Sequence, residues 1–341
     1  MIKYALNLKE ITPFNRMQIE HLANLAGKFS SRIIFEHKNR VINGKSMLGL
    51  LSMGVTGDDE VNLVIEGDDE EQAAQEIKAL LDSGVAPPKE AADAEALLME
   101  LKRRYADILQ ENLLGIYLHG SLAAGCFQWE RSDMDFLVVV HQPLTVEKKI
   151  ALVETLYAME KNAPPEGFEM SVLLADACRE PVFPMPYELH YSRRWTRDYE
   201  RDPQNFCQRM HGEDPDLTTH ILSLHAFGRA LYGPSVARVF GGVKREDVLC
   251  AIRNDLADAG EELHNKPVYY VLTLCRALAY LREGLVLDKK EAGQWGLAHV
   301  SRGYQGVIQA ALNAYAYGRD MFYDEAQAED FCYDAMEELM K

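Results

Sequence analysis

The sequence predicts an α+β protein in three parts: an open-faced sandwich over residues 1–87, an α/β unit over 89–205 and a helical bundle over 206–341. Strand-like and helix-like segments alternate up to about residue 200, whereas apolar residues recur at helical spacing from about residue 215 onwards. A chain of 341 residues is also too long for one ordinary domain, so its length favours two or three.

Composition and cysteine spacing indicate where such a protein works. Hydrophobic residues make up 48% of the chain, which is ample for packed cores. No apolar stretch reaches membrane-spanning length, and residues 1–10 alternate like a strand instead of forming the apolar block of a signal peptide. The six cysteines are scattered, which argues against a disulfide framework and a zinc site. We therefore expect a cytoplasmic protein with no membrane partner.

The net charge of the chain indicates which kinds of molecule it can bind. A formal charge of −17 argues against nucleic acid, because a polyanion would meet an acidic surface without a compensating stripe of Lys and Arg. An acidic cleft concentrates cations, so the same charge suits a small cationic substrate.

The first part has elements in the order βαββαβα, which predicts helices on one side of an antiparallel sheet. Its predicted strands cover residues 2–8, 32–37, 41–42 and 60–66, and its predicted helices cover 17–27, 46–52 and 69–82. Gly-Val-Ala-Pro-Pro at 84–88 then indicates a linker, followed by an amphipathic helix over about 90–111.

The second part carries a turn and a pair of carboxylates. A strand over 114–119 leads into Gly-Ser-Leu-Ala-Ala-Gly at 120–125, and Ser-Asp-Met-Asp at 132–135 opens an apolar run. Alternate residues of a strand share a face, so Asp133 and Asp135 converge while Met134 turns away. Two hard oxygen ligands beside backbone N–H groups and a hydroxyl suit Mg²⁺ carrying a nucleoside triphosphate. The alternative is a strand end with two solvated aspartates.

Glu169 favours the catalytic interpretation of this pair. It opens a second β-like run over 168–174, on the opposite face from Phe168 and Met170. A third carboxylate at the start of a neighbouring strand would complete an acidic trio of Asp133, Asp135 and Glu169.

Apolar residues at helical spacing predict that the third part is a bundle without internal repeats. The predicted helical segments cover residues 218–232, 245–262, 267–282, 291–300, 304–317 and 325–340.

The Gly-Ser turn followed by Asp-x-Asp resembles the signature of the nucleotidyltransferase superfamily, which implies a polymerase-beta-like α/β domain. With Leu-Thr-Leu-Cys-Arg at 272–276, then Gly284, Lys289 and Trp295, it is similar to the aminoglycoside nucleotidyltransferases that adenylylate streptomycin and spectinomycin. This resemblance covers about residues 95–341 and implies a two-domain enzyme with ATP and the drug in the cleft between its domains.

The resemblance implies that the matching residues act on the metal, the acceptor or the nucleotide. Asp133 and Asp135 would hold Mg²⁺, and Glu169 would be the base that takes the proton of the acceptor hydroxyl. The residues that would bind ATP come from both domains: Gly120, Ser121, Ser132, Arg276, Lys289 and Tyr315.

Three bundle residues also have interpretations of their own. Arg276 lies in an apolar helical stretch, where an unpaired charge is costly and a phosphate partner is favoured. Lys289 belongs to the charged run 288–291, so a solvated surface position is the alternative. Trp295 is interpreted as a core residue rather than a ligand contact.

The acceptor site departs from the family pattern. Where the family has an acidic drug-contacting residue before the Leu-Thr-Leu helix, this sequence has His-Asn-Lys-Pro at 264–267. The aromatic residue after the Pro-x-x-Glu-Leu segment is offset, with Arg193 and Arg194 preceding Trp195. Glu188 of that segment is retained without an assigned role. These departures leave the nucleotide chemistry intact and the identity of the acceptor open.

Residues 1–87 resemble the histidine-containing phosphocarrier protein HPr in element order, in Asn-Gly-Lys-Ser-Met-Leu at 43–48 and in the closing stretch 66–70. The family's active loop carries His-x-Arg-Pro, whereas this chain has Asn15, Arg16, Met17 and Gln18. An amide cannot carry a phosphoryl group, so phosphocarrier activity is not expected. Ser46 matches the family's regulatory serine, and we interpret it as a helix N-cap, with phosphorylation as the alternative.

The leading hypothesis is therefore an Mg²⁺-dependent enzyme that moves AMP from ATP to a hydroxyl of a small, cationic, aminoglycoside-like acceptor and releases pyrophosphate. One alternative is the same transfer to a protein or metabolite. The other is a regulatory binding protein, in which residues 1–87 dock a protein partner. The intact acidic trio argues against a pure binding protein, because such a protein does not require three converging carboxylates.

Overall fold

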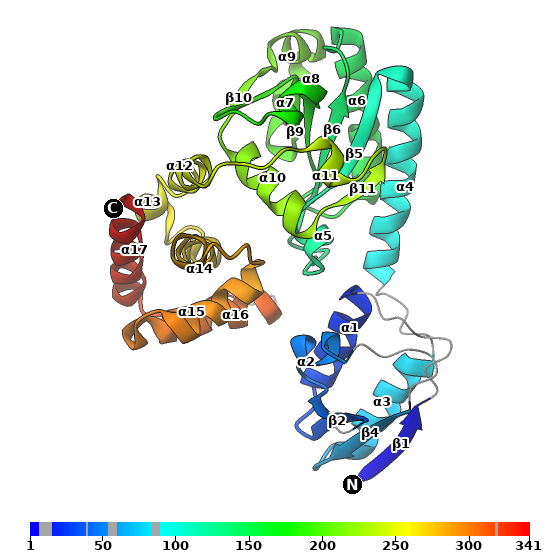
Figure 1. Cartoon of the computed structure of the whole chain (residues 1–341), viewed down its shortest axis with the longest axis vertical. Coiled ribbons are helices and arrows are strands. Elements are labelled where there is room, and N and C mark those ends of the chain that lie inside the picture. Colours follow the sequence, from blue (N-terminus) through cyan, green and yellow to red (C-terminus); the bar gives the residue numbers. More distant parts are fainter. Residues whose placement is uncertain (7–15, 39, 54–59, 83–88, 318–319) are drawn as a thin grey trace. The chain divides into compact units, whose positions relative to one another are not determined.

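The computed structural model divides into two compact units, Met1–Ala96 and Leu97–Lys341 (Figure 1). It describes residues 1–6, 16–38, 40–53, 60–82, 89–317 and 320–341. The predicted linker at 84–88 and position 15, where the sequence has Asn, lie outside these ranges. Among the described helices, none combines the length and the apolar character that crossing a membrane requires.

The first unit is the open-faced sandwich that the sequence predicts. Its antiparallel sheet has the order β1-β4-β2-β3, and residues of its three helices share one core with the sheet. Ile33 and Phe35 alternate into this core, where they join Leu22 and Ile77 from two helices. The elements are β1 (Ile2–Leu6), α1 (Arg16–Gly27), β2 (Arg32–His37), β3 (Arg40–Asn43), α2 (Met47–Leu51), β4 (Val61–Glu66) and α3 (Glu70–Asp82).

Ser46 lies immediately before α2 and has the contact expected of an N-cap. Its Oγ accepts a hydrogen bond of 3.1 Å from the backbone N–H of Gly49. The capping interpretation of Ser46 is therefore confirmed.

The second unit contains a five-stranded sheet of order β11-β5-β6-β7-β9. The pair β6 and β7 is parallel, and the other neighbours are antiparallel. The strands are β5 (Leu113–Leu118), β6 (Met134–Val140), β7 (Phe168–Leu174), β9 (Leu189–Ser192) and β11 (Arg229–Tyr232). A separate two-stranded ribbon pairs β8 (Met185–Tyr187) with β10 (Gly212–Asp214).

Helices cover both faces of the five-stranded sheet. On one face, Tyr105 of α4 (Lys89–Leu109) contacts the Phe136 ring and donates a hydrogen bond to the carbonyl of Leu152 in α6 (Val146–Met159). On the other face, Leu137 shares a core with Ile221 of α10 (Asp216–Phe227). Short helices complete the sheet layer, which comprises the sheet and the helices on both of its faces: α5 (Gly120–Ala124), α7 (Ala175–Arg179), α8 (Thr196–Arg201), α9 (Pro203–Arg209) and α11 (Val236–Val239).

The remaining helices form the predicted bundle around α14 (Pro267–Glu283), which is buried along most of its length. Trp295 belongs to this bundle, is 7% exposed and donates from Nε1 to Glu283, so its interpretation as a core residue is confirmed. The other bundle helices are α12 (Arg245–Asp255), α13 (Ala259–Glu262), α15 (Lys289–His299), α16 (Gln305–Tyr317) and α17 (Glu325–Met340).

The prediction of one helix over 218–232 is wrong for residues 228–232. Residues 229–232 form β11, which pairs with the edge of β5 through the register Arg229 to Leu118. The helix before it ends at Phe227 with Gly228 as its C-cap, and the edge of β5 offers backbone groups that a strand satisfies. Both α10 and β11 therefore belong to the sheet layer, although the predicted boundary at 205/206 placed them with the bundle. The predicted helix over 245–262 is likewise divided into α12 and α13.

Candidate active site

Three carboxylates converge at one end of the sheet. Asp133 precedes β6, Asp135 lies within it, and Glu169 lies opposite Asp135 on the parallel strand β7. One oxygen from each lies within 4.8 Å of the others. Burial raises the pKa of Asp135 well above its usual range, and the carboxylates of Asp133 and Glu169 raise it further. Such crowding of hard, negative oxygens fits a divalent cation such as Mg²⁺.

The turn after β5 is shaped around one of these carboxylates. Gly120 has a φ of +64°, and a Cβ built on it would lie 1.7 Å from Oδ2 of Asp135. The backbone N–H of Ser121 donates a hydrogen bond to the Asp135 carboxylate. Glycine is therefore required at this position both by conformation and by contact.

Replacing Gly120 with Ala should lower both stability and activity. The left-handed backbone costs a non-glycine residue about 1 kcal/mol or more, and the new methyl group would displace the Asp135 carboxylate. Thermal unfolding and turnover measure the two effects. Gly242→Ala is the matched control, because a Cβ there meets nothing within 4 Å. Equal effects of the two substitutions would contradict this account of the turn.

The loop between the turn and β6 is tied to the bundle. Ser132 is 8% exposed, and its Oγ accepts from the backbone N–H of Gln128 at 3.1 Å. The Gln128 side chain donates to the carbonyl of Tyr315 at 3.0 Å, and Arg131 donates to the carbonyl of Ala314 at 3.2 Å. The Tyr315 hydroxyl donates to the carbonyl of Cys126 at 3.4 Å. Tyr315 thus fixes the loop that leads into Asp133.

Two cations approach the carboxylates from the bundle. Arg276 is exposed, although its neighbours along α14 on both sides are buried. Lys289 begins α15, and its Nζ lies 4.9 Å from the centre of the Tyr269 ring. Burial lowers the pKa of Lys289, as does Arg276, while the Asp133 and Asp135 carboxylates oppose that shift. Lys289 is therefore not an ordinary solvated surface residue.

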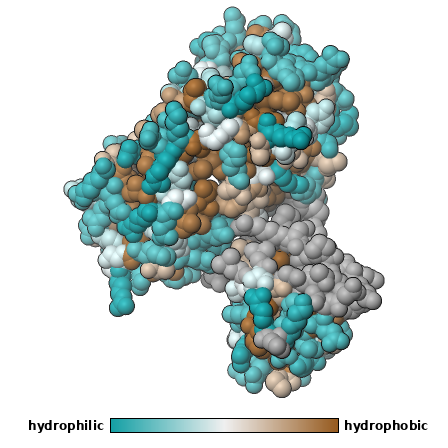
Figure 2. Space-filling view, in the orientation of Figure 1, coloured by the Kyte–Doolittle hydropathy of each residue, from teal (hydrophilic) through white to brown (hydrophobic). Residues whose placement is uncertain are grey.

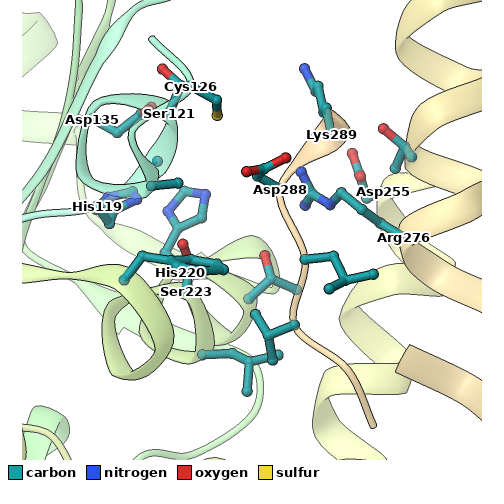
Figure 3. A pocket seen from close by; sticks show the side chains of 18 of the residues that line it. His119, Ser121, Cys126, Asp135, His220, Ser223, Asp255, Arg276, Asp288 and Lys289 are labelled. Atoms are coloured by element: carbon teal, nitrogen blue, oxygen red, sulfur yellow. The ribbon is translucent and has the colours of Figure 1, made fainter. Parts of the chain in front are cut away.

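One cavity of about 390 Å³ joins the sheet layer to the bundle. Figure 3 shows His119, Ser121, Asp135 and His220 on one side of it, and Asp255, Arg276 and Lys289 on the other. Figure 2 shows apolar side chains gathered where the two layers of this unit meet, within a largely hydrophilic surface. All the site residues that the sequence predicts line this cavity: Gly120, Ser121, Ser132, Asp133, Asp135, Glu169, Arg276, Lys289 and Tyr315.

The structure adds cavity residues that sequence reasoning missed. The rings of His119 and His220 lie 4.7 Å apart, and burial lowers the pKa of His119 well below its usual range. His119 directly precedes Gly120 and Thr273 lies within Leu-Thr-Leu-Cys-Arg at 272–276, whereas the others lie on helices outside any recognised motif. The additional polar residues include His119, Asp216, His220, Asp255, Tyr269 and Thr273. Glu188, by contrast, accepts a hydrogen bond from the backbone of Leu144 and does not line the cavity.

Two family models match the chain. The model described as aminoglycoside adenylyltransferase, C-terminal domain, matches residues 238–338, and the model described as PTS HPr component phosphorylation site matches residues 18–83. An aminoglycoside (3'') (9) adenylyltransferase from Shigella flexneri is 26% identical over 268 residues, which cover 72% of this chain and 98% of the relative. The HPr-like protein Crh of Bacillus subtilis is 33% identical over 60 residues, or 18% of this chain and 71% of the relative.

A solved structure shares the fold of the larger part of the chain. The crystal structure of spectinomycin adenyltransferase AAD(9) from Enterococcus faecalis, described with ATP and spectinomycin, has a TM-score of 0.62 and 20% identity to this chain. The match covers 72% of this chain and 99% of that one.

Proposed function

We propose that this chain, a member of the aminoglycoside nucleotidyltransferase family joined to an HPr-like domain, moves AMP from ATP to a hydroxyl group of a small aminoglycoside-like molecule and releases pyrophosphate. The observation that carries the proposal is the arrangement of charge around one cavity. Asp133, Asp135 and Glu169 lie on its sheet side, while Arg276 and Lys289 enter from the bundle. Transfer of this kind would inactivate an antibiotic acceptor.

The carboxylate cluster suits the metal that this reaction needs. We assign Asp133 and Asp135 as the residues that would hold Mg²⁺, because both are hard oxygen donors crowded within 4.8 Å of Glu169. When bound, Mg²⁺ neutralises charge on the phosphates and on the group in transfer.

The protein side chains would divide the remaining work. Glu169 accepts the proton of the acceptor hydroxyl, and burial raises its pKa, which makes its carboxylate a stronger base. Arg276 and Lys289 stabilise negative charge on the triphosphate from the bundle. Ser121 is suited to a phosphate oxygen, because its Oγ has no hydrogen-bond partner among the described residues.

Pyrophosphate release is the test of this proposal. The full chain is incubated with Mg²⁺, each nucleoside triphosphate in turn, and a panel of aminoglycosides and aminocyclitols. We expect release with ATP and at least one cationic acceptor, together with an acceptor product heavier by one AMP. Release of pyrophosphate only with a protein or an uncharged metabolite would replace the proposed acceptor, and no release with any acceptor would refute the enzyme assignment.

The HPr-like domain should not carry a phosphoryl group. The position of the family's histidine is Asn15 here, and the arginine and proline positions hold Met17 and Gln18. We expect no phosphoryl transfer from phosphoenolpyruvate through the phosphotransferase enzymes, measured with labelled phosphate and with a phosphorylatable HPr as positive control. A labelled, acid-labile product on residues 1–87 would contradict this expectation.

Removing the HPr-like domain should spare adenylyl transfer. A chain that starts at Lys89 keeps all of α4, whose Tyr105 packs on the nucleotidyltransferase sheet. We propose that residues 1–87 form an independent docking module for a protein partner, so this shorter chain should keep kcat and KM within a few-fold of the full chain. A shorter chain that is folded and inactive would show instead that the module contributes to the site.

A further inference from the structure

Two carboxylates outside the predicted site face the same cavity from different layers of the second unit. Asp216 is the first residue of α10, whose next residue, Leu217, is buried in the core of the sheet layer. Asp255 is the last residue of α12, and Leu256 after it is buried in the bundle core. The pair therefore spans the junction between the sheet layer and the bundle.

Negative groups outnumber positive ones around Asp216. Burial raises the pKa of Asp216 to about 6, with further contributions from Asp214 and Asp255 and an opposing one from His220. Oδ1 of Asp216 is buried and has no hydrogen-bond partner among the described residues. Oδ1 of Asp255 accepts a hydrogen bond of 2.8 Å from the Tyr269 hydroxyl, and Asp255 lines the cavity.

A third polar group indicates a ligand-binding position independently of these charges. Thr273 lies one helical turn after Tyr269 and lines the cavity. It is 5% exposed, and its hydroxyl has no hydrogen-bond partner within the described part of the chain. A buried hydroxyl without a partner costs free energy, which a bound donor would recover.

We propose that Asp216 and Asp255 bind a cationic amine or guanidine of the acceptor, with Thr273 accepting a further hydrogen bond from the same ligand. This inference rests on the proposed function and names the part of the acceptor that the site recognises. An ammonium group supplies both the positive charge that the two aspartates lack and several N–H donors for their oxygens. The subsite adjoins Glu169, which contributes to the field at Asp216, so a cation held here lies beside the base.

The cation would also join the two layers. Asp216 and Asp255 repel each other across the junction, and a positive group between them converts that repulsion into attraction on both sides. Binding of the acceptor is thereby linked to alignment of Arg276 and Lys289, which the bundle carries, with the carboxylates of the sheet.

The test measures binding independently of turnover. Calorimetry with streptomycin and with spectinomycin, in the presence of Mg²⁺ and an unreactive ATP analogue, compares the full-length protein with Asp216→Asn, Asp255→Asn and Glu246→Gln. Glu246 is an exposed residue of the same helix as Asp255 and does not line the cavity, so its variant is the matched control. We expect each Asp variant to weaken drug binding by about tenfold or more while the control stays near wild type. Spectinomycin acetylated on both of its amines, which lacks the positive charge, should bind weakly to every form.

The outcomes separate the subsite from the reaction. Unchanged drug affinity in both Asp variants, or no binding of either drug to the wild-type protein, would overturn the subsite even if AMP transfer to another acceptor occurs. Drug binding that depends on both aspartates, without any pyrophosphate release by the wild-type protein, would support the subsite and refute the proposed reaction. Thermal unfolding of each variant shows whether it is folded, since Asn keeps the shape of Asp.

Discussion

Replacing Asp135 with Asn should reduce nucleotidyl transfer by about a thousandfold or more while leaving the protein folded. The carboxylate is one of the two that would hold Mg²⁺, and loss of that charge compensation is worth several kcal/mol in the transition state. Unfolding should occur at the same or a higher temperature in the metal-free variant, because burial and neighbouring carboxylates disfavour the ionised form of Asp135. Turnover, Mg²⁺ dependence and thermal unfolding are the measurements.

A second substitution at this position tests the place of the carboxylate separately from its charge. Asp135→Glu keeps the charge but lengthens a side chain that already touches Gly120, where a Cβ would lie 1.7 Å from Oδ2. We expect this variant to be inactive as well, because the carboxylate can no longer occupy the same place. Asp133→Asn should match Asp135→Asn in its loss of turnover. Activity within a few-fold of wild type in either Asn variant would refute the assignment of the pair.

Replacing Glu169 with Gln should eliminate most of the turnover and spare the binding of Mg-ATP. A positioned general base contributes about 10²- to 10⁴-fold, and the amide of Gln cannot accept the proton of the acceptor hydroxyl. The measurements are kcat and an equilibrium titration of the nucleotide. Because the three carboxylates lie within 4.8 Å of one another, a parallel loss of nucleotide affinity would instead make Glu169 a third metal ligand.

Glu188→Gln is the control for this experiment. Glu188 is retained from the Pro-x-x-Glu-Leu segment, yet its side chain accepts from the backbone of Leu144 and lies away from the cavity. A glutamine oxygen can accept the same hydrogen bond, so activity should stay within a few-fold of wild type.

The sequence predicted the part of the site that local spacing encodes. Asp133, Asp135 and Glu169 alternate with apolar residues at the starts of two strands, and a period of two determines which side chains share a face. Arg276 was also indicated by its place in an apolar helical stretch, whereas Lys289 was available only through resemblance, because a single cation in a charged run has no spacing to interpret. Their common cavity with the carboxylates depends on how α14 and α15 pack in the bundle.

The missed features depend on contacts distant in sequence. Asp216 and Asp255 are single residues at the ends of two helices, and only the packing of those helices brings them to one cavity. The strand β11 was predicted as helix because the apolar periodicity of α10 continues through it. Its four residues adopt a strand because they pair with the edge of β5, which lies more than a hundred positions earlier in the chain.

The two side chains that tie the loop before Asp133 to the bundle have a consequence for how such enzymes diversify. Gln128 and Arg131 both donate to main-chain carbonyls, at residues 315 and 314, rather than to side chains. Every amino acid offers that same acceptor, so these two bonds place no demand on side-chain identity in this stretch of α16. Substitutions at positions 314 and 315 can therefore accumulate while these two bonds between the loop and α16 are kept.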